Sequence, residues 1–238
     1  MILAGGLGTR LWPITRAIPK PMVPVAGAPF LEHQLKLLQR QGITDILLLT
    51  GYFGEQIEDY FGNGLKSGLS IRYSRETTPR GTAGALRQAA ELLAEQFLLM
   101  YGDSFLPICY VDVLDAHRDS RAEGLVVVCD NRMADTDVPS NIALDEHAFV
   151  VRYDKDNPGD PQLTHVEAGV LGFSRSIVEL IPEGFVSLER HLYPKLILRH
   201  QLVAYQTQQR FYDIGTPARL GVIEAFLSHD HHQNSFSN

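Results

Sequence analysis

The sequence has little cysteine, no long apolar run and no excess of basic residues. Its 238 residues include two cysteines, and Lys and Arg (21) are outnumbered by Asp and Glu (28), which gives a formal net charge of −7. A nucleic-acid surface or a polybasic membrane contact needs an excess of Lys and Arg, so neither partner is expected. No run approaches the roughly 18 apolar residues of a membrane-spanning helix, so no membrane span is predicted.

The two cysteines, Cys109 and Cys129, lie in apolar surroundings and lack a paired spacing. Together with the absence of a secretory leader, this predicts reduced thiols in a cytoplasmic protein. The first strand before the glycines has only three residues, so we expect the true start to lie slightly upstream. A monomer and a homo-oligomer are both compatible with the sequence.

Short apolar runs alternate with helical patterns through the first hundred residues. Residues 45–50 (DILLLT) and 97–101 predict buried strands, and residues 30–41 predict a helix. This alternation is typical of βαβ units and indicates an α/β domain with a mostly parallel central sheet. Further strands are expected at 1–3, 69–75, 125–129, 142–144, 149–153, 170–173 and 202–206, and further helices at 54–61, 82–95, 187–199 and 217–228. One domain over 1–228 with a disordered tail at 229–238 is the simplest interpretation.

A glycine-rich segment follows the first strand directly. Gly5, Gly6 and Gly8 have no Cβ, so backbone N–H groups can approach a phosphate closely. Arg10 offers a planar fork for phosphate oxygens, and Lys20, held between two prolines, offers a compact charge. The pattern predicts a phosphate-binding loop, and a plain glycine turn with two exposed cations is the alternative.

Two other phosphate motifs do not fit this segment. A dinucleotide fingerprint needs a third glycine where Leu11 stands and an acid about twenty positions on, but no acid occurs before Glu32, inside a predicted helix. A P-loop needs Gly-Lys-Ser/Thr, and this triplet is absent from the sequence. Both are excluded.

The ordered motifs LAGG-x-GTRL and PKP resemble those of the sugar-phosphate nucleotidyltransferase family, and the resemblance covers residues 1–228. It implies a three-layer, Rossmann-like nucleotidyltransferase fold that binds a nucleoside triphosphate and a sugar 1-phosphate. It also implies that Arg10 neutralises the departing end of the triphosphate and that Lys20 contacts phosphate near the reacting α-phosphorus. The nucleotide-binding residues that it implies are Leu3, Ala4, Gly5, Gly6, Gly8, Thr9, Gly81, Thr82 and Gly84.

The last three belong to the segment TPRGTAGAL (78–86), which is similar to the family's base-reading loop. Read alone, GTAG at the start of a helix indicates an N-cap formed by Thr82.

Two aspartates resemble the family's Mg²⁺ ligands. Asp103 follows the apolar strand FLLMYG, and the carboxyl end of a parallel strand faces the crevice where such sheets bind ligands. Asp213 lies in FYDIGTP and matches the family's late aspartate. Two carboxylates together with nucleotide phosphates suit Mg²⁺, which prefers oxygen ligands. The alternative is that each aspartate only caps a turn.

On the sugar side, the resemblance implies that Asp154 and Lys155 contact the sugar phosphate, that Glu167 bonds sugar hydroxyls and that Gly169 allows close approach. Family members usually have glycine where Ser140-Asn141 stands, so the detailed sugar contact at this position stays open. The histidines on predicted helices (His33, His117, His191 and His200) are interpreted as ordinary surface or half-buried residues. Those of the tail (His229, His231 and His232) are interpreted as solvated, with adventitious metal binding as the alternative.

The resemblance implies an enzyme that transfers a nucleoside monophosphate to a sugar 1-phosphate and releases pyrophosphate. The motifs RGTAGAL and YDIGTP are most similar to the heptose-1-phosphate and mannose-1-phosphate guanylyltransferase branch, which favours GTP. Thymidylyl, uridylyl and cytidylyl transfer remain open, because the base is read mainly by backbone. A non-catalytic nucleotide-sugar sensor of the same fold is the principal alternative.

Overall fold

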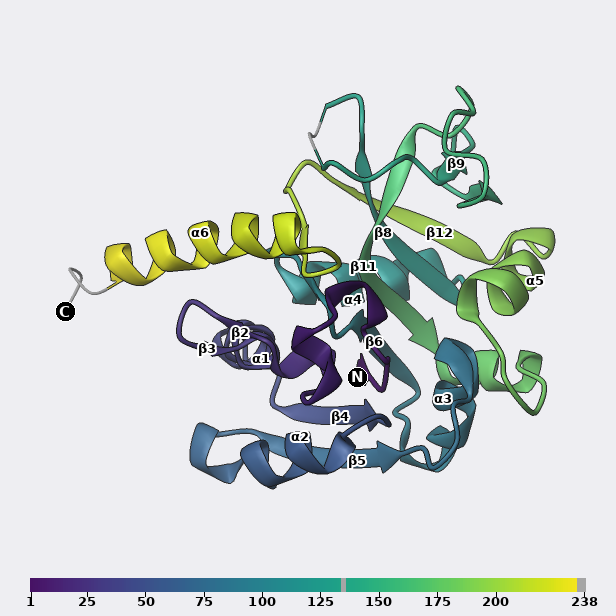
Figure 1. The fold of residues 1–238 in the computed structure, drawn as a ribbon. Helices are drawn as coiled ribbons and strands as arrows, with labels where there is room; N and C mark the ends of the chain where they lie inside the picture. Colours follow the sequence, from purple (N-terminus) through teal and green to yellow (C-terminus); the bar gives the residue numbers. More distant parts are fainter. Residues whose placement is uncertain (134–135, 235–238) are drawn as a thin grey trace.

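The computed structural model describes residues 1–133 and 136–234 and contains a nine-stranded mixed sheet (Figure 1). The strand order is β10-β9-β11-β6-β1-β4-β5, and β8 joins β11 to β12 off this path. The strands of the sheet are β1 (Ile2–Ala4), β4 (Asp45–Thr50), β5 (Ser70–Arg75), β6 (Gln96–Tyr101), β8 (Gly124–Asp130), β9 (Ile142–Leu144), β10 (Val150–Tyr153), β11 (His165–Ser174) and β12 (Leu202–Thr207). Two small ribbons complete the strands, β2 (Pro24–Val25) with β3 (Ala28–Pro29) and β7 (Ser104–Phe105) with β13 (Tyr212–Asp213).

The half of the sheet built from the first hundred residues is parallel. Strand β1 pairs in parallel with β4 and β6, and β4 pairs in parallel with β5. Strand β11 then runs antiparallel to both β6 and β8, and β12 is parallel to β8. The α/β fold expected from the sequence is confirmed, and the carboxyl ends of β1, β4, β5 and β6 share one edge.

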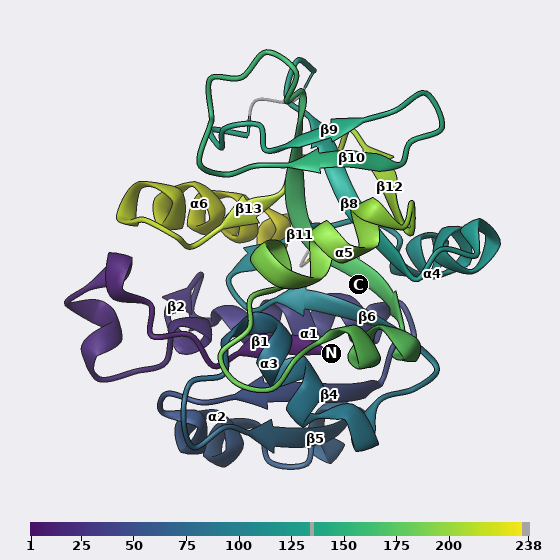
Figure 2. The same ribbon diagram turned by 90° about the vertical axis from the view of Figure 1, so that its right-hand side faces the viewer.

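Helices cover both faces of the sheet. They are α1 (Phe30–Arg40), α2 (Gly54–Phe61), α3 (Gly81–Gln88), α4 (Tyr110–Ser120), α5 (Tyr193–Leu198) and α6 (Pro217–Asn234). Successive strand side chains point to opposite faces. In β4, Ile46 and Leu48 join the core under α1, α2 and α4, whereas Leu47 and Leu49 join the core under α3 and α5. Figure 2 shows α3 and α5 in front of the sheet and α1 behind it. A strand buried on both faces explains the unbroken apolar run DILLLT.

Three helical segments differ from those predicted. Helix α4 has no predicted range, although His117 was expected on a helix, because its buried face is Tyr110, Val113 and His117 and a polar residue interrupts the apolar period. His117, expected at the surface or half-buried, is fully buried. The helix expected at 82–95 ends at Gln88 and continues only as a 3₁₀ turn. The helix expected at 187–199 begins with a π-helical turn, Leu188–Leu192, before α5.

The end of the chain also differs from the prediction. Helix α6 continues to Asn234, so residues 229–234, expected in a disordered tail, are helical; they contain no Gly or Pro that would end a helix. Residues 235–238 of that predicted tail lie outside the described residues. No described helix is both long and apolar enough to cross a membrane.

Candidate functional site

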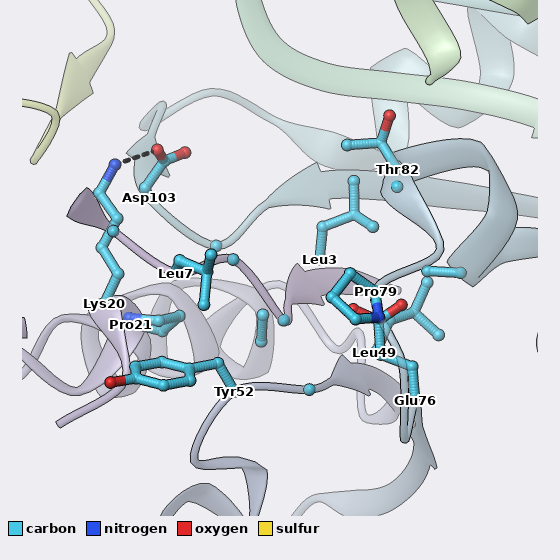
Figure 3. Close-up of a pocket in the computed structure, with 18 of the residues that line it drawn as sticks. Leu3, Leu7, Lys20, Pro21, Leu49, Tyr52, Glu76, Pro79, Thr82 and Asp103 are labelled. Carbon is cyan, nitrogen blue, oxygen red and sulfur yellow. Dashed lines mark hydrogen bonds and ion pairs between the residues drawn. The ribbon is translucent and has the colours of Figure 1, made fainter. Parts of the chain in front are cut away.

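A cleft of about 980 Å³ lies at the carboxyl edge of the parallel strands. Its walls come from the segments after β1, β4, β5 and β6 together with the start of α3 (Figure 3). The predicted site residues that line it are Leu3, Ala4, Gly5, Gly6, Gly8, Thr9, Lys20, Gly81, Thr82 and Asp103. Residues from four separate stretches of sequence are therefore brought into one cavity of ligand size.

One end of the cleft carries an ion pair between Lys20 and Asp103. Lys20 begins a 3₁₀ turn, and its side chain is only 10% exposed. Asp103 stands in the turn between β6 and β7. A lysine so far removed from water needs a compensating charge, and Asp103 supplies it. This end therefore presents a positive and a negative group to a common ligand, beside the glycines of the first loop.

The other end of the cleft carries Glu76, which follows β5 directly (Figure 3). The backbone N–H of Arg80 donates to its Oε2 at 3.0 Å. Its Oε1 lies over glycine backbone, 2.9 Å from where a Cβ on Gly51 would stand. Among the described residues no group donates a hydrogen bond to Oε1. Burial raises the pKa of the Glu76 carboxyl. Sequence reasoning missed this residue, although a carboxylate at the end of a parallel strand was a usable signal.

Thr82 does not cap its own helix. The N-cap position of α3 is Arg80, which makes no side-chain cap hydrogen bond. The hydroxyl of Thr82 instead accepts from the backbone N–H of Leu188 at 2.8 Å. Gly84, predicted beside it, faces the backbone of a neighbouring segment, since a Cβ there would lie 2.8 Å from the carbonyl oxygen of Gly184. The GTAG sequence therefore allows residues 184–188 to pack closely on α3.

None of the predicted sugar-side residues, all of which the structure describes, lines the cleft, and Glu167 is the buried one among the charged ones. Glu167 is 7% exposed, and it accepts hydrogen bonds from the hydroxyls of Tyr153 (2.8 Å) and Tyr193 (2.7 Å). Burial raises the pKa of Glu167, against the opposing effect of Lys155, whose Nζ lies 4.0 Å from it. Neither tyrosine was predicted, because each reads in sequence as a core aromatic.

Glu189 connects Lys155 to the cleft and was also missed. It accepts hydrogen bonds from Lys155 Nζ at 3.1 Å, from Ser187 Oγ at 2.7 Å and from the hydroxyl of Tyr101 at 3.3 Å. Burial raises the pKa of its carboxyl, but Lys155 and Ser187 outweigh burial and hold that pKa below its usual range. Tyr101 lines the cleft, so Glu189 bridges the two predicted half-sites.

Asp154 and Gly169, predicted to bind the sugar phosphate, contact other residues of the chain. The carboxylate of Asp154 accepts from Arg152 at 2.7 Å. Gly169 has φ +78°, and a Cβ there would lie 2.6 Å from Cβ of Ser104. The close approach that Gly169 permits in this structure is thus to the chain itself, next to Asp103.

Asp213 lies beside Asp103 along the backbone, because β13 pairs with β7 and the N–H of Ile214 donates to the carbonyl of Asp103 at 3.0 Å. Its carboxylate accepts from the N–H of Gly215 at 2.6 Å and from Arg219 at 3.1 Å. Arg10 is exposed, and its guanidinium lies beside Gly215. Neither Asp213 nor Arg10 is among the described residues that line the cleft.

The carboxylates of Asp103 and Asp213 supply only part of the ligands that a divalent cation needs. Among the described residues no group of three or more His, Cys, Asp or Glu side chains is arranged to hold a metal ion. One or two carboxylates together with phosphate oxygens are nevertheless the ligands that Mg²⁺ uses at nucleotides, and the backbones of Asp103 and Asp213 lie side by side. Each carboxylate carries a cationic partner, Lys20 on Asp103 and Arg219 on Asp213.

Residues 1–228 match the nucleotidyl transferase family. Mannose-1-phosphate guanylyltransferase of Mycobacterium tuberculosis is 34% identical over 221 residues, which are 91% of this chain and 61% of that protein. Mannose-1-phosphate guanyltransferase of Gibberella zeae is 30% identical over 91% of this chain and 60% of its own length. The chain thus spans about three fifths of the length of these curated relatives.

Solved structures share the fold. HddC from Yersinia pseudotuberculosis superposes with a TM-score of 0.80 at 26% identity, over 95% of this chain and 97% of HddC. HddC complexed with GMP-PN gives a TM-score of 0.79. A third structure is from Bacillus anthracis and is named as a putative glucose-1-phosphate thymidylyltransferase. It superposes with a TM-score of 0.83 at 22% identity, over 95% of this chain and 94% of that one. This likeness concerns the fold alone.

Proposed function

The chain belongs to the nucleotidyl transferase family, and on that premise we propose that it transfers a nucleoside monophosphate from a nucleoside triphosphate, with GTP favoured, to a sugar 1-phosphate. The products are a nucleoside-diphosphate sugar and pyrophosphate. The observation that carries this proposal is the single cleft that has Lys20 and Asp103 at one end and Glu76 at the other. Its two ends are complementary to the two ends of a nucleotide, the phosphates and the base.

The preference for GTP rests on Glu76. It lines the cleft, and its Oε1, beside Gly5 and Gly51 of the same lining, accepts no hydrogen bond from the described residues. A partly buried carboxylate oxygen without a donor is costly, so a ligand that donates to it gains affinity. Guanine presents two adjacent donors on its Watson–Crick edge, the ring N1–H and the 2-amino group, whereas adenine presents an acceptor at N1. A guanylyl donor is also supported by the names of the mannose-1-phosphate guanylyltransferase relatives and by the GMP-PN complex of HddC.

In the proposed reaction, an oxygen of the sugar phosphate attacks the α-phosphorus in line, and pyrophosphate leaves. The attacking phosphate is already ionised at neutral pH, so no side-chain base is needed; the obstacle is repulsion between two anions. Lys20 at the α-phosphate and Arg10 toward the departing end would offset it, with the N–H groups of Gly5–Arg10 around the triphosphate. Asp103 and Asp213 would hold Mg²⁺, which when bound neutralises phosphate charge and orients the phosphates.

The sugar phosphate would bind on the Lys155 side. Lys155 pairs with the buried Glu167 and the half-buried Glu189, and its side chain is 50% exposed, so it is available to a phosphate. We propose that Glu167 and Glu189 accept from sugar hydroxyls, with Asp154 and Gly169 completing this half-site. Mannose 1-phosphate is supported by the names of the two guanylyltransferase relatives, and heptose 1-phosphate stays open through the resemblance of RGTAGAL and YDIGTP.

The location proposed is the cytoplasm, where the free thiols of Cys109 and Cys129 would stay reduced.

The test is a matrix of GTP, ATP, UTP, CTP and dTTP against mannose, glucose and heptose 1-phosphates, scored by pyrophosphate release with and without Mg²⁺. We expect release with GTP and one or more of these sugar phosphates, and none after chelation of the metal. Tight binding of a nucleotide sugar with no pyrophosphate release from any pair would instead identify a non-catalytic sensor.

A further inference from the structure

In the described part of the chain, two large exposed apolar side chains, Leu7 and Phe185, line the cleft, and Phe185 is the aromatic and the more exposed of the two. It is 70% exposed to solvent, and it lines the nucleotide cleft. Among the described residues no aromatic ring stacks on it. An isolated exposed apolar residue is ordinary on a protein surface. Here, however, the ring already stands in the wall of a ligand-sized cavity, so a ligand that fills the cavity will cover it.

The segment that carries Phe185 is fixed to the start of α3. The N–H of Val186 donates to the carbonyl of Arg80 at 2.7 Å, and the Val186 carbonyl accepts from Ala83 at 2.9 Å and from Gly84 at 3.1 Å. Gly81 has φ +72°, and a Cβ there would lie 2.6 Å from that carbonyl oxygen. The backbone at Val186 is therefore held against the backbone of residues 80–84, and this contact fixes the position of residue 185.

The residue that follows Phe185 is buried in the core. Val186 is 2% exposed and belongs to the core under α3 and α5. The Phe185 ring stays outside this core, because it is largely exposed and lines the cleft. The buried side chain of Val186 thus anchors the residue that carries the ring at the wall of the site.

The occupant that would cover Phe185 is the nucleotide. The cleft that it lines contains the glycine loop, Lys20, Glu76 and Thr82, but not Lys155, Glu167 or Glu189. An aromatic ring offers an apolar surface that suits a flat base or the C–H face of a ribose and selects no hydrogen-bonding edge. We propose that Phe185 is an apolar cover over the nucleoside of the bound triphosphate, which adds affinity without choosing the base. This inference rests on the proposed function.

The experiment is titration calorimetry of Mg²⁺-loaded GTP, and of UTP by competition, into the wild type, Phe185→Ala and Phe185→Leu, without sugar phosphate so that no reaction occurs. We expect Phe185→Ala to weaken both nucleotides by the same factor of about ten, and Phe185→Leu to keep most of the affinity, because apolar area is what is lost. Leu198→Ala is the matched control, since Leu198 is 88% exposed at the end of α5, outside the cleft. It should leave binding unchanged.

The inference is wrong if Phe185→Ala binds GTP within twofold of the wild type, if only one of the two bases is affected, or if the change appears only in the KM for the sugar phosphate. A wild-type protein that binds no nucleoside triphosphate would refute the proposed function itself, and the role of Phe185 with it. Wild-type binding that is retained in Phe185→Ala would refute only the role of Phe185.

Discussion

Replacing Glu76 by Gln tests how the cleft chooses its base. The variant keeps the shape of the side chain, and its amide oxygen can keep the hydrogen bond from the Arg80 N–H that Oε2 accepts at 3.0 Å. The amide NH₂ then stands where Oε1 stood, so a donor faces the donors of guanine. A hydrogen bond to a charged group is worth about 1.5–3 kcal/mol. We therefore expect the Kd for GTP to rise by about 10- to 100-fold.

Calorimetric titration with GTP and ATP measures this effect. ATP should bind the variant no more weakly than the wild type, because adenine places an acceptor where guanine has N1–H. Glu91→Gln, an exposed glutamate after α3, is the matched control for the loss of one negative charge and should change neither value. If GTP and ATP lose affinity in Glu76→Gln by the same factor, Glu76 acts on the fold of the loop and does not read the base.

Further predictions concern the ion pair, a glycine and pH. Lys20→Ala or Asp103→Ala should lower turnover by about 10²-fold or more, because each removes a charge placed at the phosphates; pyrophosphate release near the wild-type rate would contradict the assignment. Gly169→Ala should cost about 2–4 kcal/mol and lower Tm by roughly 5–15 °C, because it combines positive φ with a clash at Ser104, whereas Gly159→Ala, in open space, should leave Tm unchanged. Burial raises the pKa of Glu76, so the preference for GTP over ITP, which lacks the 2-amino group, should be complete above that pKa and decline as the pH falls through it. A ratio of their kcat/KM values that stays constant down to the pH at which free carboxyl groups are protonated would argue against it.

Much of the parallel half of the fold was predictable because its signals are local. Strand β4 and helix α2 have the predicted bounds, since a six-residue apolar run and an amphipathic segment closed by glycine each determine their own element. The bounds of helix α4 were not predictable in the same way, because one of its buried positions is His117, whose burial depends on its packing against Gly172 of β11.

The candidate site likewise has one part that local signals predicted and one part that they did not. The glycine loop, Lys20, Gly81, Thr82 and Asp103 line one cleft, as expected for residues that follow the ends of neighbouring strands. The partners of the more distant residues were not foreseen: Arg219 on Asp213, Arg152 on Asp154, and Glu189 on Lys155. The roles of these residues stay predictions, because they depend on how the sites change when substrates bind.

By itself the sequence determined that a glycine-rich loop follows a buried strand and that an α/β sheet gathers a few cations and carboxylates at one edge. Both features follow from side-chain volume, the backbone freedom of glycine and the spacing of apolar residues, which are properties of short stretches of sequence. Only the tertiary structure decided that Glu76 and Phe185 line the cleft, that Oε1 of Glu76 accepts no hydrogen bond from the described residues and that Glu189 joins the two halves. Such contacts join residues that are far apart in the chain, and they depend on packing that no short stretch of sequence contains.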